Sequence, residues 1–152
     1  MKTLTTVGRD NWPFVIKYRA YATERYFRLA CNRVFESDDN KAQAFCSFET
    51  SDSGYGLATL SFQMNPRDGT PPMTQVSHEA THAAVYLEAW FRRNHRIRRV
   101  DHDEFLAYMS SGISALAQVW IDNGYQEPLP EAPAEVALLE ISKAFATIEE
   151  TS

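Results

Sequence analysis

Two proline-rich breaks divide this sequence and limit what it can fold into. The segment NPRDGTPP, residues 65–72, has three prolines and one glycine in eight residues, and YQEPLPEAP, residues 125–133, has three prolines in nine. Neither segment can continue a helix or an interior strand, because proline lacks the amide donor and fixes φ. Strand-like patterns precede the first break and helical patterns follow it. This order of elements predicts an α+β fold.

Before the first break, the chain predicts strands and one helix. Residues 13–21 (PFVIKYRAY) are rich in β-branched and aromatic residues and predict a strand. Residues 23–35 carry both a strand-like alternation and an apolar stripe at helical spacing, and we favour a helix capped by Thr23. The cluster TSDSGYG separates two strand-like runs, which predicts a β-hairpin of Ala44–Glu49 and Gly56–Gln63. The members of the helical stripe are Tyr26, Phe27, Ala30, Val34 and Phe35.

After the first break, apolar residues recur at three- and four-residue spacing. They predict a helix from about Thr74 to Asn94 and a second helix that Asp101 or Asp103 caps and Gly124 ends. We expect one domain over residues 1–125, with a small hairpin or sheet packed on a helical core. A proline-rich linker, 126–133, then leads to a C-terminal amphipathic helix, 134–150, packed on the same domain. The apolar positions of that last helix are Val136, Leu139, Phe145 and Ile148.

Charge and composition exclude several classes of protein. The net charge of −5 argues against a protein that coats nucleic acid. No segment approaches 18 consecutive apolar residues, so we expect no membrane span, and the first residues have no apolar run, so we expect no signal peptide. Two cysteines, Cys31 and Cys46, fit small core positions better than a disulfide framework. These features favour a cytoplasmic protein.

The stretch QVSHEATHAAVYLEAWF contains the pattern His-Glu-x-x-His on the first of these helices. His78 and His82 lie four residues apart, so their rings project from one face and can occupy two corners of a zinc tetrahedron. Glu79 is rotated from His78 by about 100° and cannot easily join the same ligand set. It can instead reach a metal-bound water and act as its general base. The spacing therefore predicts a metal site.

A third protein ligand has several candidates. The scheme HExxHxxGxxH is rejected, because Val85 occupies the glycine position and Glu88 the last one. Glu104 is favoured because we expect it well inside the next helix, where a ligand is held rigidly. Small residues in that helix, including Gly112, would let it approach the motif helix closely. The competing ligands are Asp101, Asp103, His95 and His102.

These residues resemble a known family pattern. VSHEATHAAVYLEAW followed by DEFLAYMSSGISAL resembles the gluzincins, with HExxH on one helix and ExxA on the next. The sequence is more closely similar to small phage- and prophage-encoded zincin-type proteins, in which a β-hairpin precedes HEAxH and an E-x-x-A-Y helix follows. The resemblance covers roughly residues 42–120. It implies a zincin-like fold in which His78, His82 and Glu104 bind Zn²⁺ and Glu79 activates water.

One position departs from the gluzincin pattern. Gluzincin peptidases often carry an acidic residue after the alanine, where it orients a histidine ligand, and Tyr108 stands there in this chain. Either the Tyr108 hydroxyl orients the histidine ligand instead, or the metal is bound less firmly. A peptidase also needs a donor for the oxyanion of the tetrahedral intermediate. The candidates are His95, His102, Tyr108 and Tyr125.

The sequence thus predicts a zinc-dependent hydrolase, most simply a metallopeptidase acting on a peptide or protein. The run RRNHRIRR, residues 92–99, supports an alternative. In that alternative, a phage-encoded, metal-bound but non-catalytic protein binds an acidic host protein through an Arg-rich loop that includes Arg92, Arg96 and Arg98. Nucleic acid is a less favoured partner, because no recognition motif accompanies the charge. A virion component is a third class, without direct support. A phage-encoded chain would act in the host cytoplasm.

Overall fold

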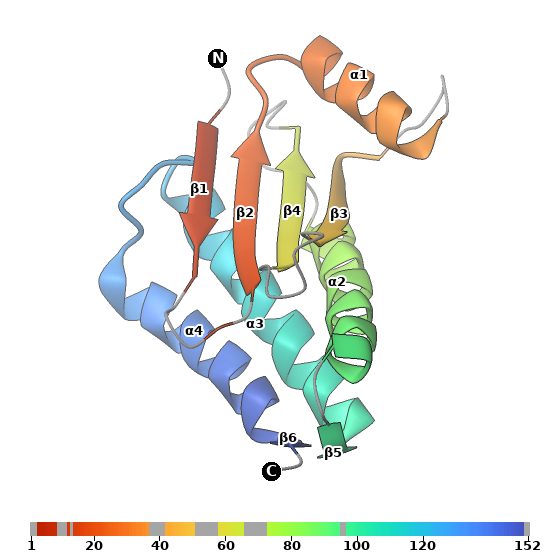
Figure 1. The fold of residues 1–152 in the computed structure, drawn as a ribbon. Helices are drawn as coiled ribbons and strands as arrows, with labels where there is room; N and C mark the ends of the chain where they lie inside the picture. Colours follow the sequence, from red (N-terminus) through yellow and green to blue (C-terminus); the bar gives the residue numbers. More distant parts are fainter. Residues whose placement is uncertain are drawn as a thin grey trace.

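The computed structural model of this chain describes residues 3–8, 12, 14–36, 42–50, 58–65, 73–94 and 97–150. Six strands and four helices occur in these ranges (Figure 1). In chain order they are β1 (Thr3–Val7), β2 (Phe14–Ala20), α1 (Glu24–Phe35), β3 (Ala44–Thr50), β4 (Ala58–Met64), α2 (Met73–Asn94), β5 (Ile97–Val100), α3 (His102–Asp122), α4 (Glu131–Ala146) and β6 (Ile148–Glu150). The fold is α+β, as the order of the sequence patterns predicted.

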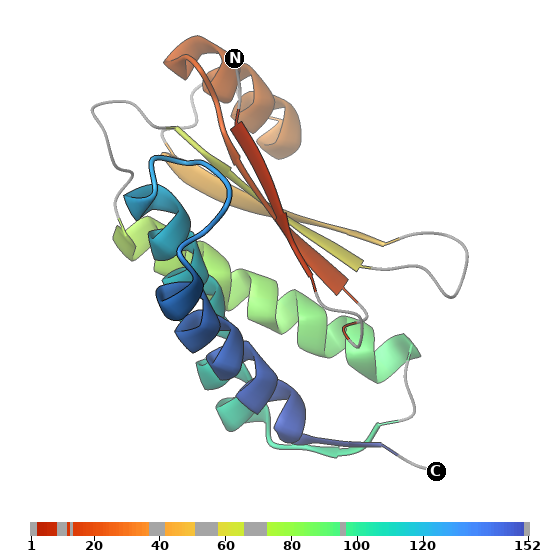
Figure 2. The ribbon, with the colours of Figure 1, turned by 90° about the vertical axis from the view of Figure 1, so that its left-hand side faces the viewer.

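The main sheet is four-stranded and mixed, in the order β1-β2-β4-β3. β2 and β4 are parallel, whereas β1 and β3 each pair antiparallel with their neighbour. β2 and β4 both alternate between buried and half-buried residues, so one face of the sheet is apolar. Helices α2, α3 and α4 all lie on one side of the sheet, and α1 lies at one end on the other side (Figure 2).

The helical layer joins the sheet through large buried side chains. Tyr18 of β2 stacks on Phe62 of β4 and contacts Trp120 of α3, with ring centroids 5.4 Å and 5.6 Å away. Its hydroxyl donates to the carbonyl of Ile113, also in α3, over 3.0 Å. This satisfies a polar group that would otherwise be costly to bury. The contact fixes α3 against the middle of the sheet.

Gly112 brings α3 close to α4, whereas we expected the small residues of α3 to bring it close to the motif helix, which it also contacts. A β-carbon at Gly112 would lie 2.5 Å from Cγ1 of Ile141 and 3.0 Å from the carbonyl oxygen of Ala137. Only a glycine allows the two helices to pack at this separation. α4 also differs from the prediction in its limits and orientation. It begins at Glu131, inside the predicted linker, and Val136 and Leu139 are exposed rather than buried.

The small cluster on the other side of the sheet belongs to α1. Phe27 and Cys31 of this helix pack on Phe45 of β3. Thr23 caps the helix as predicted, since its Oγ1 accepts from the amide of Tyr26 over 3.2 Å. Val34 and Phe35, which we expected on the apolar stripe, are exposed together with Tyr26.

The structure contains several of the predicted elements and three strands that were not predicted. The hairpin and the helix around HExxH are confirmed by β3–β4 and α2, and Asp101 caps α3. β1 and the β5–β6 pair were not predicted. Across the described ranges, no helix is long and apolar enough to cross a membrane.

Candidate metal centre

The two histidines of the HExxH pattern lie side by side in the first half of α2. Nε2 of His78 and Nε2 of His82 are 3.0 Å apart, with ring centroids separated by 4.5 Å and the rings nearly perpendicular at 86°. Both side chains are exposed. The structure therefore brings together the two imidazoles that the four-residue spacing predicted would share a face.

The separation of these nitrogens suits a common metal ion. A tetrahedral zinc ion, with Zn–N distances of about 2.0–2.1 Å, holds two nitrogen ligands about 3.3 Å apart. The observed 3.0 Å differs from this value by a few tenths of an ångström. A small rotation of exposed rings can supply that change. The imidazoles therefore fit two positions of a zinc tetrahedron.

Glu79 is half-buried on α2, in a less exposed position than either histidine. Burial raises the pKa of its carboxyl above the ordinary value, and the neighbouring His82 and His78 oppose that rise. The pKa of Cys46 on β3 is raised mainly by burial and further by the charge of Glu79. The Glu79 carboxyl is therefore close enough to β3 for its charge to act on Cys46. A half-buried glutamate beside two imidazoles is well suited to accept and release protons.

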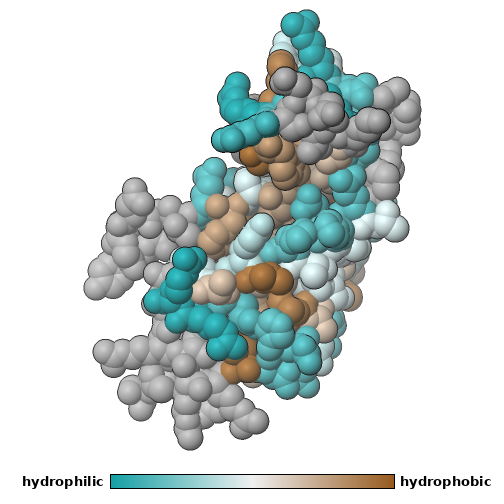
Figure 3. Space-filling model, turned by 90° about the vertical axis from the view of Figure 1, so that its right-hand side faces the viewer, coloured by the Kyte–Doolittle hydropathy of each residue, from teal (hydrophilic) through white to brown (hydrophobic). Residues whose placement is uncertain are grey.

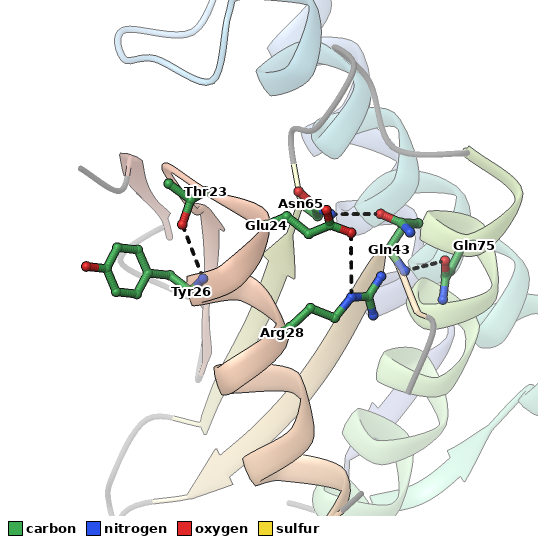
Figure 4. A network of polar contacts seen from close by, with 7 residues as sticks. All are labelled: Thr23, Glu24, Tyr26, Arg28, Gln43, Asn65 and Gln75. Atoms are coloured by element: carbon green, nitrogen blue, oxygen red, sulfur yellow. Dashed lines mark hydrogen bonds and ion pairs between the residues drawn. The ribbon is translucent and has the colours of Figure 1, made fainter. Parts of the chain in front are cut away.

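Contacts on both sides of the motif fix α2 beside β3. Oε1 of Gln75 accepts from the amide of Gln43, which precedes β3, over 2.9 Å. Oε1 of Gln43 in turn accepts from Nδ2 of the buried Asn65, also over 2.9 Å (Figure 4). Further along the helix, the ring of Tyr86 lies 6.1 Å from that of Phe48 in β3 and 6.4 Å from that of His82. The helix is thus attached to β3 one turn before and one turn after the histidines.

β3 is an edge strand of the main sheet. β4 pairs with β2 on one side and β3 on the other. Among the strands that the structure describes, the edge strand beside the motif is therefore β3. Figure 3 shows this side of the molecule, where hydrophobic and hydrophilic side chains alternate on the surface.

Glu104, the favoured third ligand, lies apart from the histidines. It is the third residue of α3 and not deep inside the helix, and its amide donates to Oδ1 of the capping Asp101 over 3.0 Å. Tyr108, four residues on and therefore on the same face, has Nζ of Lys143 in α4 5.8 Å from its ring centroid. Glu104 and Tyr108 thus lie on the face of α3 that turns toward α4. Within the described ranges, no group of three His, Cys, Asp or Glu residues is placed to hold a metal ion.

His102 has a different partner from the one we considered. Its Nδ1 lies 2.6 Å from Oε1 of Glu88 in α2, and Nε of Arg92 lies 3.6 Å from the same oxygen. Glu88 is only 8% exposed, and its other oxygen is buried with no hydrogen-bond partner among the described residues. Sequence reasoning considered Glu88 only as a metal ligand. Glu88 follows Leu87 of the apolar stripe of α2. This position indicates a buried carboxylate, which needs a partner.

The remaining predicted site residues are dispersed or undescribed. Arg92 lies in the last turn of α2, and Arg98 lies in β5, so part of the expected Arg-rich loop is a strand. His95 and Arg96 fall outside the described residues, as does the side chain of Arg98. Tyr125, whose pKa is raised by burial, packs edge-on against Trp120 with centroids 5.0 Å apart.

Comparison with known proteins adds no assignment to this geometry. No protein-family model, curated protein or solved structure matches the chain. The chemistry of the site therefore has to be inferred from His78, Glu79, His82 and their surroundings.

Proposed function

We propose that this protein is a zinc-dependent hydrolase of the zincin type that cleaves peptide bonds. The observation that carries the proposal is the 3.0 Å separation of the His78 and His82 Nε2 atoms, with the half-buried Glu79 between them in sequence. The likeness of HEATH and EFLAY to the gluzincin-type phage proteins supports the same interpretation.

The chemistry assigns one role to each motif residue. When bound, Zn²⁺ supplies a Lewis acid and lowers the pKa of a coordinated water to about 7. The Glu79 carboxylate accepts a proton from the attacking water and later delivers it to the nitrogen of the leaving amine.

The edge of β3 is the place we assign to an extended substrate. A peptide that adds to this edge would pair with the backbone groups on the outer side of the strand. The attachment of α2 to β3 through Gln75 and Tyr86 would then hold the peptide at a constant distance from Glu79. This arrangement favours a peptide over a small, compact substrate.

The third metal ligand is a separate part of the proposal. The resemblance assigns this role to Glu104, whereas the described structure turns the residue toward α4. We retain Glu104 as the residue to test first, because the resemblance names it and no carboxylate or imidazole in the described ranges completes a group of three with the histidines. For Glu104 to bind zinc with the histidines, α3 has to rotate about its axis so that this side chain turns toward α2.

The proposal is tested by Glu79→Gln in zinc-loaded protein with a mixture of quenched fluorescent peptides. We expect the rate of hydrolysis to fall by about 10²–10⁴-fold while bound zinc and thermal stability are retained. Glu140→Gln is the matched control, since this glutamate pairs with Lys143 on α4 over 3.1 Å, away from the motif. Equal hydrolysis by wild type and Glu79→Gln, or none by wild type, would contradict catalysis at this site.

A further inference from the structure

A second candidate site lies on the other side of the sheet from α2. A concave pocket of about 480 Å³ opens between α1 and the end of β2. Its volume falls in the range of pockets that bind small molecules. The residues that line it are Arg19, Tyr21, Ala22, Tyr26, Leu29, Ala30 and Arg33.

One face of α1 supplies the outer wall of this pocket. Tyr26, Leu29, Ala30 and Arg33 follow the spacing i, i+3, i+4, i+7 and therefore share a face. The neighbouring stripe, Phe27 and Cys31, is the one that packs on the sheet. Tyr26 and Leu29 are 59% and 53% exposed, so this face carries apolar surface that packing against the sheet does not use.

The inner wall comes from β2 and the residues after it. The ring of Tyr21 is held in place, since its hydroxyl donates to Oε1 of Gln63 and its edge meets Phe27 at 5.9 Å between centroids. Arg19 is more unusual. Its Nε is buried and has no hydrogen-bond partner in the part of the chain that the structure describes. A buried, unsatisfied guanidinium donor is costly unless a ligand or water satisfies it.

The charge of the pocket contrasts with that of the whole chain. The protein has a net charge of −5, yet both charged side chains that line the pocket are arginines. Arginine binds carboxylate and phosphate oxygens with paired, charge-assisted hydrogen bonds. Apolar and aromatic surface lies beside these guanidinium groups. The lining thus combines two positive charges with apolar and aromatic side chains.

We propose that this pocket binds a small organic anion: a carboxylate or phosphate group attached to a flat apolar body. The guanidinium groups of Arg19 and Arg33 bind the oxyanion. The body of the ligand packs between Tyr21, Tyr26 and Leu29. This site is independent of the HExxH motif and of any hydrolysis there.

Binding of phenyl phosphate, monitored through amide chemical shifts of the ¹⁵N-labelled full chain, tests the proposal. Inorganic phosphate and phenol serve as probes for the two halves of the ligand. We expect phenyl phosphate to shift the signals of residues 19–33 and to bind more tightly than either half. Arg19→Gln and Arg33→Gln should each weaken its binding about tenfold or more.

Arg25→Gln is the matched control, because this exposed arginine of α1 does not line the pocket. It should leave phenyl phosphate binding unchanged. Arg33→Gln, on the surface of a helix, keeps the test decisive if Arg19→Gln does not fold. No binding of phenyl phosphate at 10 mM, or equal binding by wild type and Arg33→Gln, would overturn the assignment.

Discussion

Nδ1 of His102 lies 2.6 Å from Oε1 of Glu88, so the first residue of α3 is bonded to a buried carboxylate of α2. The connection spans the segment between the two helices, and Arg92 approaches the same oxygen. It joins the end of the motif helix to the start of the helix that carries Glu104. The position of α3 relative to the metal site depends on this contact.

His102→Ala should therefore destabilise the zinc-free protein. Without the imidazole, the buried carboxylate of Glu88 loses its closest hydrogen-bond partner. We expect this loss to lower the free energy of unfolding by about 1–3 kcal/mol. Urea denaturation of wild type, His102→Ala, Glu88→Leu and the double variant measures the coupling between the two residues. A coupling energy near zero would show that the pair does not hold the helices together.

Gly112→Ala should destabilise the protein through the contact between α3 and α4. The added β-carbon would lie 2.5 Å from Cγ1 of Ile141 and 2.9 Å from its backbone nitrogen, so the helices must separate. We expect a loss of about 1–3 kcal/mol in the free energy of unfolding. Ser111→Ala, at the neighbouring exposed position, should change it by less than about 0.5 kcal/mol. Equal stability of the two variants would argue against this close approach.

At neutral pH, the Glu79 carboxylate should lower the free energy of unfolding of the zinc-free protein. Because burial raises the folded-state pKa of Glu79, its stabilising contribution is fully present below the unfolded pKa of about 4.3. That contribution is lost as the pH rises through the folded pKa. Glu79→Gln should therefore melt at a higher temperature than wild type at pH 7, with a smaller difference at pH 4.

Thermal melts at both pH values, with Glu49→Gln as the control on an exposed position of β3, measure this effect. A lower melting temperature for Glu79→Gln than for wild type at pH 7 would mean that the carboxylate stabilises the metal-free fold. Glu79 would then not destabilise the metal-free protein.

Local patterns in the sequence predicted much of the fold. The β3–β4 hairpin, α2 and the Thr23 and Asp101 caps each depend on residues close together in the chain. The β5–β6 pair joins two short strands that lie far apart in the sequence, so no local pattern identifies it, whereas β1 pairs with the nearby β2 and was not predicted. α4 shows a second limit. It buries the small residues Ala137 and Ala144 against α3, so its larger side chains, Val136 and Leu139, face outward.

The same distinction applies to the site. The relation between His78 and His82 follows from helix geometry alone, and the structure places their rings together. The position of Glu104 depends on how α3 is rotated about its axis, which the Gly112 contact with α4 and the His102–Glu88 pair determine. The sequence contains these residues but does not show their partners.

Zinc affinity, measured by competition with a chromophoric chelator, tests the central claim most directly. We predict one zinc ion per chain in wild type, binding at least about 100-fold weaker in His78→Ala and in His82→Ala, and unchanged binding in Glu140→Gln, the control on α4. Loss of affinity in Glu104→Ala would assign the third ligand, and its retention would remove Glu104 from the site. Zinc binding that is equal in wild type and His78→Ala would contradict the account.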